Sequence, residues 1–329
     1  MNSALRRLIE PRLLIIMGKG GTGKTTVAAA LGTLAAREGA ETVVIEVAAE
    51  STLPGLLSAD PELDLSDARD PTELRPHLST MRIAPRVALE EYLELRLPVR
   101  RLAAAIVHNQ GFARFLDAAP GWRELITLGK IWHLERQEIR GRPRYDVIIV
   151  DAPSTGHGLS FLSVPSVVLD SVRMGPLRRH TDAVWRLLRD PERTLIVPVT
   201  LPEELPVKET LELYERIQTL GLRVGAPIVN CVEDPPAITD VESVLGILGQ
   251  IPAGSAPSQL AEPAALSAAL GHRLTRARLQ RQFIDKLGLE TGSTPLELPY
   301  VVEAIEGPRG VRRVADALES ALERADNWP

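Results

Sequence analysis

Short apolar runs alternate along this chain with longer stretches whose apolar residues recur at helical spacing. The runs are rich in Val, Ile and Leu, and most are apolar throughout, which is typical of strands covered on both faces. Alternation of such strands with helices favours a parallel sheet joined by crossover helices. The expected strands are residues 12–17, 42–47, 81–84, 145–151, 194–199, 226–232 and 296–301.

Helical periodicity is clearest near the middle and near the C-terminus of the chain. Apolar residues share one helix face at Leu125, Leu128 and Trp132, and again at Val311, Val314, Ala315, Leu318 and Leu322. The stretch 86–142 shows no convincing strand, so we expect a helical subdomain there, inserted into a single domain that spans residues 1–329. Residues 233–273 are rich in Pro, Ala, Ser and Gly, which predicts loops with short helices.

Composition narrows the classes of function. The chain has 329 residues and a formal net charge of −5, without a basic stripe, which argues against nucleic acid as a partner. The single cysteine, Cys231, excludes a disulfide framework and a cysteine-based zinc site, and we expect it to be an inert core thiol. The apolar runs are too short to span a bilayer. We therefore expect a cytoplasmic protein without stable membrane insertion.

The most specific signal lies in residues 18–25. They read Gly-Lys-Gly-Gly-Thr-Gly-Lys-Thr and fit the phosphate-binding pattern G-x-x-x-x-G-K-[ST], with Thr22 at the last variable position. Glycines let successive backbone N–H groups turn toward phosphate oxygens. The glycines of this loop are Gly18, Gly20, Gly21 and Gly23.

The residues around the loop support a nucleotide site. A buried strand is expected before it and a helix after it, so the positive end of that helix faces the anion. Lys24 supplies a charge to the phosphates, and Thr25 supplies a hydroxyl to Mg²⁺. The sequence thus predicts ATP and Mg²⁺ as ligands and an α/β fold of the phosphate-loop NTPase class, with a doubly wound, mostly parallel sheet.

Lys19 is unusual because the phosphate-binding pattern does not require a lysine directly after its first glycine. We expect its side chain at the tip of the loop, pointing away from the core of its own subunit. From there it could reach a phosphate across a dimer interface, as an arginine finger does in trans. A solvated surface lysine is the alternative, and the spacing does not decide between them.

Polar residues follow two other expected strands. Asp151 ends an apolar run at the sheet edge where α/β folds bind ligands, and an acid there holds Mg²⁺ or caps the next turn. Gly156 and His157 lie in the Pro-led turn that follows, which suits a segment that contacts a γ-phosphate and relaxes after hydrolysis, although a lone histidine in a turn is also typical of plain surface. Asn230 offers a donor and an acceptor that match an adenine edge, but Asn also commonly ends strands.

Taken together, these residues resemble the arsenite-pump and tail-anchored-protein-targeting ATPase family, a branch of the deviant phosphate-loop ATPases. The family loop K-G-G-V-G-K-T-T is matched by residues 19–26 except at Thr22. The family's second switch, D-T-A-P-T-G-H-T-L, is similar to residues 151–159, which have one residue fewer before the proline and one more after it. Residues 119–125 and 202–210 also resemble family segments.

The resemblance implies a role for each matching residue. Lys19 acts in trans across a dimer that encloses the nucleotides, and Glu203 reaches the partner's nucleotide. The residues implied for the phosphates and Mg²⁺ are Lys24, Thr25 and Thr26, those for the second switch are Asp151, Gly156 and His157, and Asn230 reads adenine.

Departures from the family pattern affect the expected chemistry. Val47 stands where the family's first switch has the aspartate that positions the attacking water, so hydrolysis is expected to be slow or to need a partner. Glu46 or Glu50 could substitute for it as a catalytic group. The arsenite pump's metalloid-binding cysteines are absent, and so is the zinc-binding C-x-x-C of the eukaryotic targeting factor.

The sequence therefore predicts a Mg²⁺-dependent, ATP-hydrolysing dimeric switch that couples its nucleotide state to a client protein. The dimer is expected to form with a second copy or with a paralogue. A regulatory subunit that binds nucleotide without hydrolysing it, paired with an active paralogue, is the alternative. A membrane-cycling ATPase ranks last, because the amphipathic C-terminal segment from Val311 onward carries acidic residues rather than a basic face.

Overall fold

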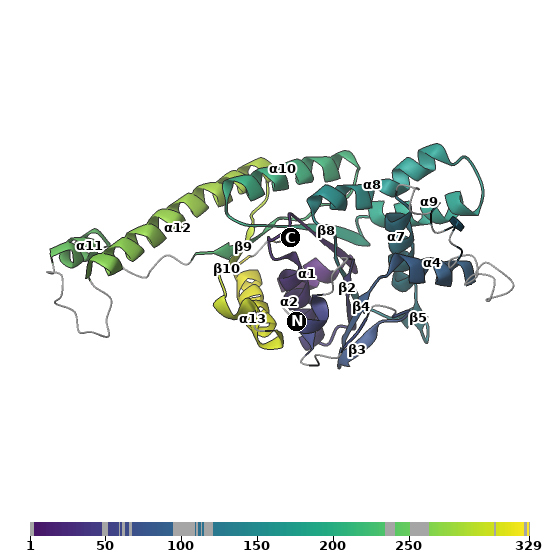
Figure 1. The fold of residues 1–329 in the computed structure, drawn as a ribbon, viewed down its shortest axis with the longest axis horizontal. Coiled ribbons are helices and arrows are strands. Elements are labelled where there is room, and N and C mark those ends of the chain that lie inside the picture. Colours follow the sequence, from purple (N-terminus) through teal and green to yellow (C-terminus); the bar gives the residue numbers. More distant parts are fainter. Residues whose placement is uncertain are drawn as a thin grey trace.

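Eight strands form the central sheet of this computed structural model, in the order β10-β9-β8-β1-β7-β2-β4-β3 (Figure 1). Neighbouring strands are parallel except at the edge, where β3 runs antiparallel to β4. The bounds are β1 (Leu13–Met17), β2 (Thr42–Glu46), β3 (Thr72–Arg75), β4 (Leu78–Arg82), β7 (Val147–Asp151), β8 (Thr194–Thr200), β9 (Ile228–Val232) and β10 (Leu296–Pro299). The predicted doubly wound, mostly parallel sheet is confirmed.

The structure describes most of the chain. The described residues are 3–47, 52–58, 60, 63–65, 68–94, 109, 111–112, 114, 121–233, 241–250, 263–305, 307–325 and 328. Glu50, Ala119 and Pro120, which the sequence singled out, lie outside them.

Helices cover both faces of the sheet, because successive strand residues point to opposite sides and both sides are apolar. Leu14 and Ile16 of β1 face the cluster beneath one set of helices, whereas Leu13, Ile15 and Met17 face the other cluster. The first set is α1 (Ser3–Ile9), α2 (Lys24–Arg37) and α13 (Pro308–Arg324). The second set is α7 (Trp122–Glu135), α8 (Thr155–Ser171), α9 (Pro176–Arg189) and α10 (Glu204–Thr219).

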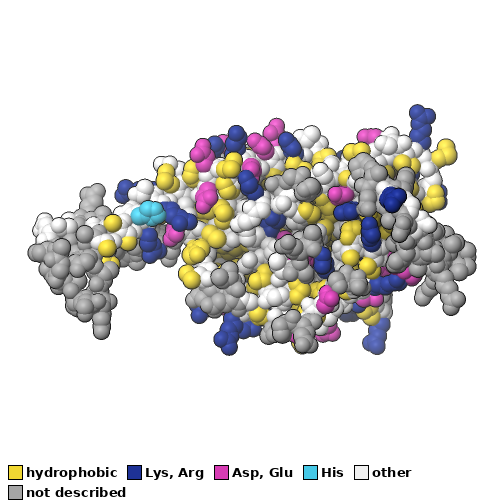
Figure 2. Space-filling model, in the orientation of Figure 1, with side chains coloured by type: hydrophobic (Ala, Val, Ile, Leu, Met, Phe, Trp, Pro, Cys, Tyr) yellow, Lys and Arg dark blue, Asp and Glu magenta, His cyan; other side chains and the backbone are white. Residues whose placement is uncertain are grey.

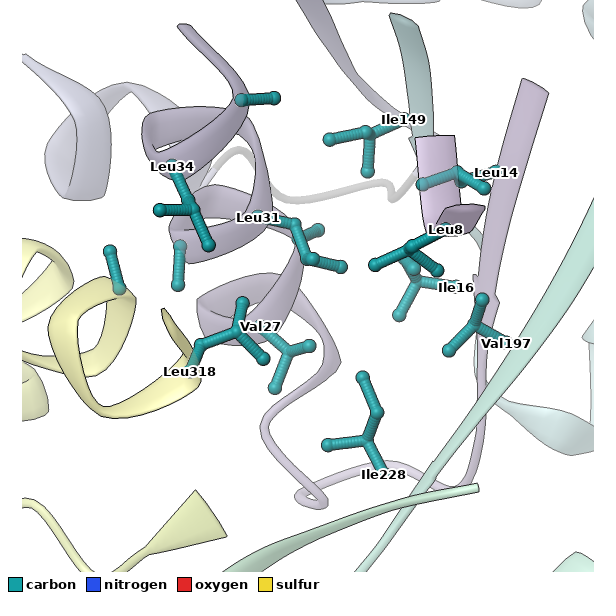
Figure 3. Close-up of a cluster of buried hydrophobic side chains, with 14 of the residues drawn as sticks. Leu8, Leu14, Ile16, Val27, Leu31, Leu34, Ile149, Val197, Ile228 and Leu318 are labelled. Atoms are coloured by element: carbon teal, nitrogen blue, oxygen red, sulfur yellow. The ribbon is translucent and has the colours of Figure 1, made fainter. Parts of the chain in front are cut away.

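The helix that follows the phosphate-binding loop is the centre of the first cluster. Figure 3 shows Leu31 and Leu34 of α2 between sheet residues such as Ile149 and the neighbouring α13, which contributes Leu318. At Gly32 the helix approaches β2 so closely that an added Cβ would lie 2.3 Å from Val44. This packing fixes the start of α2, and with it the loop, against the C-terminal edge of the sheet.

The region before α7 differs from the expectation in detail. The strand expected at 81–84 begins at Leu78, because the buried Thr80 continues the strand and its hydroxyl donates to the carbonyl of Val44. Stretch 86–142, expected without strands, ends in a small hairpin of β5 (Glu138–Ile139) and β6 (Arg142–Pro143). The helices α4 (Pro85–Glu94) and α7 agree with the helical pattern, and an inserted subdomain remains a prediction.

The expectation of loops with short helices at 233–273 is wrong in part, because a long helix begins within this stretch. The structure has α11 (Val241–Gln250) and α12 (Pro263–Thr291), and α12 is 29 residues long because good helix formers dominate its sequence. Arg281 of α12 pairs with Glu297 of β10 at 2.7 Å, which fastens the C-terminal part of the helix to the body. The N-terminal part projects with α11 as an arm, on which basic side chains are visible (Figures 1 and 2).

Two short helices complete the fold, α3 (Leu53–Leu57) and the 3-10 helix η1 (Val302–Ile305). Within the described parts of the chain, no helix combines the length and the apolar composition that crossing a membrane requires.

Candidate nucleotide site

The phosphate-binding loop leaves β1 beside β8, and the backbone at Gly18 decides how closely it does so. Gly18 has φ +153°, and a Cβ added to it would lie 2.1 Å from the carbonyl oxygen of Val199 in β8. Only glycine allows this approach without displacing the strand. The loop is thereby held over the C-terminal ends of two central strands.

The far end of the loop is held by Asn230. Its side-chain amide donates to the carbonyl of Thr22 at 3.0 Å, and a Cβ added to Gly23 would lie 2.3 Å from that amide nitrogen. Asn230 sits at a bulge in β9, where two residues oppose one in β10 and Cys231 has φ +58°. Since bulges re-aim side chains, the bulge explains why Asn230 faces the loop. Its predicted contact with adenine stays a prediction.

Cys231 is half-buried at this bulge rather than deep in the core as expected. Burial nevertheless raises the pKa of its thiol, which keeps the sulfur protonated and weakly nucleophilic.

Lys24, the first residue of α2, is buried under the loop. Its Nζ donates to the carbonyl of Lys19 at 2.9 Å, so the ammonium closes the loop on itself. Burial lowers the pKa of Lys24, and the nearby Asp151 carboxylate opposes that shift. The ammonium therefore lies where a phosphate oxygen could take over the place of a backbone carbonyl.

Asp151 ends β7 and is buried beside the start of α2. Its Oδ2 accepts a hydrogen bond from the hydroxyl of Thr25 at 2.6 Å. Its Oδ1 is buried and has no hydrogen-bond partner among the described residues. Burial, more than any other cause, raises the pKa of Asp151 to about 6, and Glu46 contributes in the same direction. A buried carboxylate oxygen without a partner, next to a hydroxyl, fits a hard divalent cation such as Mg²⁺.

Glu46 lies opposite Asp151 in the register of β2 and β7 and is fully buried. Its Oε1 accepts hydrogen bonds from the backbone N–H and the hydroxyl of Thr52, at 2.7 Å and 2.9 Å, and from Leu53 N at 3.3 Å. The carboxylate thus anchors the start of α3. The structure gives Glu46 this structural task, and its substitution for the missing aspartate stays a prediction.

Val47 follows Glu46 at the end of β2 and provides no polar side chain to this corner. Its backbone N–H donates to the carbonyl of Asp151 at 3.2 Å, and its side chain packs on the core. The position is therefore close to Asp151, but its side chain carries no group that could orient water.

Lys19 does not point away from its own subunit, as expected, but toward α10. Its Nζ pairs with Oε1 of Glu209 at 2.6 Å, and the two side chains are 38% and 28% exposed. The expectation of a freely projecting lysine is therefore wrong, because a carboxylate of the same chain lies within reach. Sequence reasoning missed Glu209, since nothing in its spacing reveals a partner 190 positions away.

The loop, the buried lysine and the strand-ending acid lie together at one edge of the sheet, and comparison with known proteins identifies the family of the chain. A family model described as "Anion-transporting ATPase" matches residues 11–182, more than half of the chain. The chain belongs to this ATPase family. The matched span includes the loop, Glu46 and Asp151, whereas Asn230 and Glu209 lie beyond it.

Individual relatives that are similar to this chain also carry ATPase names. ATPase BagA of Mycobacterium tuberculosis (strain H37Rv) is 35% identical over 230 residues, which cover 68% of this chain and 66% of the relative. ATPase GET3 of Kluyveromyces lactis is 25% identical over 260 residues, covering 67% of this chain and 71% of the relative. A putative arsenical pump-driving ATPase of Aquifex aeolicus is 26% identical over 257 residues, covering 67% and 80%. The match to BagA thus spans about two-thirds of each protein.

The segment that resembles the family's second switch is helical rather than a turn. Thr155 begins α8, and Gly158 N donates to the carbonyl of Ser154 at 2.9 Å, so Gly156 and His157 lie in the first helical turn. The side chain of His157 lies outside the described part of the structure. A Cβ added to Gly20 would lie 3.8 Å from Cβ of Ser154, which places the loop beside this switch.

The remaining predicted residues lie near the same edge of the sheet. Thr26 is half-buried in the first turn of α2, next to Thr25. Glu203 is exposed at the position that precedes α10. Their roles at the phosphates and at a partner's nucleotide stay predictions.

Proposed function

We propose that this protein is a Mg²⁺-dependent ATPase switch whose ATP-bound form joins two subunits. The observation that carries the proposal is the buried Oδ1 of Asp151, which lacks a partner among the described residues next to the Thr25 hydroxyl. Burying a carboxylate oxygen without a partner is costly, and a metal ion at that oxygen would offset the cost. A purely structural aspartate has no need of such an arrangement.

The residues of the chain divide the work of holding the triphosphate. The loop and the first turn of α2 present backbone N–H groups and the positive helix end to the phosphates. Lys24 donates to the carbonyl of Lys19 and has further N–H donors for a phosphate oxygen. Thr25 and Asp151 would hold Mg²⁺, which when bound would neutralise negative charge on the phosphates.

Transfer of the nucleotide state to a client has a physical route in the fold. The helix α8 begins at the second switch and packs against α7, which lies in the predicted subdomain 86–142. A change at Gly156 and His157 would therefore shift α7, and the helices of the predicted subdomain would carry this movement to a bound client protein. The partner is a second copy or a paralogue, and the protein acts in the cytoplasm.

One observation favours the regulatory alternative. Val47 offers no group to orient water, and Glu46 is engaged by Thr52 and Leu53. A subunit of this kind would bind ATP tightly and hydrolyse it slowly, and an active paralogue would supply the missing group.

The test of the dimeric switch is nucleotide-driven association. Sedimentation velocity of the purified protein, with Mg²⁺ and either ADP or a non-hydrolysable ATP analogue, measures the fraction of dimer. The proposal expects dimer with the ATP analogue and monomer with ADP. Equal association with both nucleotides, in the presence and absence of candidate paralogues, would contradict a switch.

A further inference from the structure

The ion pair between Lys19 and Glu209 engages the loop lysine that the family resemblance implies to act in trans across the dimer. Lys19 Nζ lies 2.6 Å from Glu209 Oε1, so the pair is both a hydrogen bond and a salt bridge. The second oxygen of Glu209, Oε2, is buried and has no hydrogen-bond partner among the described residues. Lys19 is thus the counter-charge that the structure shows for a carboxylate partly removed from water.

The backbone of Lys19 is engaged as well. Its carbonyl accepts hydrogen bonds from Lys24 Nζ at 2.9 Å and from the hydroxyl of Thr22 at 3.0 Å. The ammonium of Lys24 has three N–H donors, so one can hold this carbonyl while another reaches a phosphate. The two lysines of the loop are therefore linked in one arrangement that is satisfied within a single chain.

We propose that Glu209 holds Lys19 within its own subunit when nucleotide is absent, and so opposes association of two subunits until phosphates compete for the ammonium. This inference rests on the proposed dimeric switch, because only a role in trans requires Lys19 to leave Glu209. A triphosphate carries more negative charge than one carboxylate, so it displaces Glu209 when a second subunit brings its nucleotide close. Glu209 acts here as a positioning residue that sets the threshold for closure.

The size of the effect follows from the exposure of the pair. Ion pairs at this level of exposure usually change an equilibrium by less than about fivefold, although partial burial increases the change. Loss of the carboxylate charge should therefore strengthen ATP-driven association by about threefold to tenfold. The affinity of the monomer for nucleotide should change less than twofold, because Glu209 contacts Lys19 rather than Lys24.

The variant to test is Glu209→Gln, which keeps the shape of the side chain. Its matched control is Glu212→Gln, an exposed position one turn further along α10. The first measurement is the rate at which acetic anhydride acetylates Lys19 in the nucleotide-free protein, followed by peptide mass spectrometry. Glu209→Gln should raise this rate at least threefold, and Glu212→Gln should leave it unchanged.

The second measurement is the protein concentration at which half of the chains associate in the presence of an ATP analogue and Mg²⁺. Glu209→Gln should lower that concentration by about threefold to tenfold relative to the wild type and to the control variant. Weaker association of Glu209→Gln would overturn the proposal, since Glu209 would then assist closure. An unchanged acetylation rate would also overturn it. Absence of ATP-driven association in the wild type would instead contradict the dimeric switch, while the acetylation rate would still decide whether Glu209 holds Lys19.

Discussion

Thr25 donates its hydroxyl to Asp151 across 2.6 Å, and this bond joins residues that lie 126 positions apart in the sequence. Thr25 lies in the first turn of α2 and Asp151 ends β7, so the bond ties the helix that follows the phosphate-binding loop to the strand that ends in the predicted metal-binding acid. The arrangement brings together a hydroxyl, a carboxylate and a buried ammonium before any ligand is bound.

Lys24→Ala should weaken ATP binding about 10- to 100-fold, because it removes charge-assisted hydrogen bonds to the phosphates in a buried site. Isothermal titration calorimetry with ATP and Mg²⁺ measures the change. The control is Lys286→Ala, which removes an exposed lysine of α12 far along the chain from the loop. Wild-type affinity in Lys24→Ala would show that the loop does not bind phosphates.

Asp151→Asn should reduce the gain in ATP affinity that Mg²⁺ provides by about 10- to 100-fold, since neutral Asn is a poor ligand for a hard cation. Binding without Mg²⁺ should change little or improve. The matched control is Asp146→Asn, an exposed aspartate just before the same strand. Equal losses with and without Mg²⁺ would contradict a metal-holding role.

The burial of Asp151 also predicts a pH dependence of stability. The pKa of this carboxyl is raised from 3.8 to about 6 in the folded protein, so the folded state keeps a proton that the unfolded chain releases. The free energy of unfolding of the nucleotide-free protein should therefore fall as the pH rises from about 4 to about 6. Asp151→Asn removes this decrease, and at pH 7 the nucleotide-free variant should be more stable by about 1–3 kcal/mol.

Urea denaturation at several pH values, without Mg²⁺ or nucleotide, measures this difference. The wild type and Asp151→Asn should converge near pH 4 and diverge as the pH rises. A difference that is independent of pH would show that the carboxyl is ionised with an ordinary pKa in the folded state.

These predictions separate what the sequence could reveal from what it could not. Lys24, Thr25 and Asp151 are predictable because each belongs to a local pattern of strand, loop and helix, and the pattern alone dictates where backbone and side chain meet. The ion pair of Lys19 with Glu209 could not be predicted, because it depends on how α10 packs after the crossover from β8.

The other differences also have local causes that composition hides. Asn230 reaches the loop because β9 contains a bulge, in which two residues oppose one residue of β10. No residue type in that strand predicts a bulge at this position. A turn is expected at Gly156 and His157 because glycine favours turns. The apolar residues that follow favour a helix instead, and α8 begins already at Thr155. In α12, residues that are common in loops are outnumbered by Ala, Leu, Arg and Gln, which favour the helix.

Asn230→Ala distinguishes two roles for this side chain. Loss of its hydrogen bond to Thr22 should weaken nucleotide binding about two- to tenfold through a looser loop. If Asn230 also reads adenine, the preference for ATP over GTP should fall in the variant. An equal loss for both nucleotides would limit Asn230 to holding the loop.

The first switch bears on the rate of the reaction. Loss of a water-orienting residue typically costs about 10²–10⁴ in rate, so the isolated protein should hydrolyse ATP slowly while binding it well. Glu46→Gln and Glu50→Gln, measured separately, test whether either carboxylate substitutes for the missing aspartate. A fast rate of hydrolysis that neither variant reduces would show that Val47 does not occupy the position of the water-orienting residue.

The most direct test of the account is steady-state phosphate release by the purified protein at saturating ATP, measured with Mg²⁺ and with EDTA over a series of protein concentrations. The account predicts slow release that requires Mg²⁺, disappears in Lys24→Ala and rises per subunit as the protein concentration increases, because the closed dimer is the active form. Absence of Mg²⁺-dependent release at every concentration, with candidate paralogues present as well as absent, would contradict it.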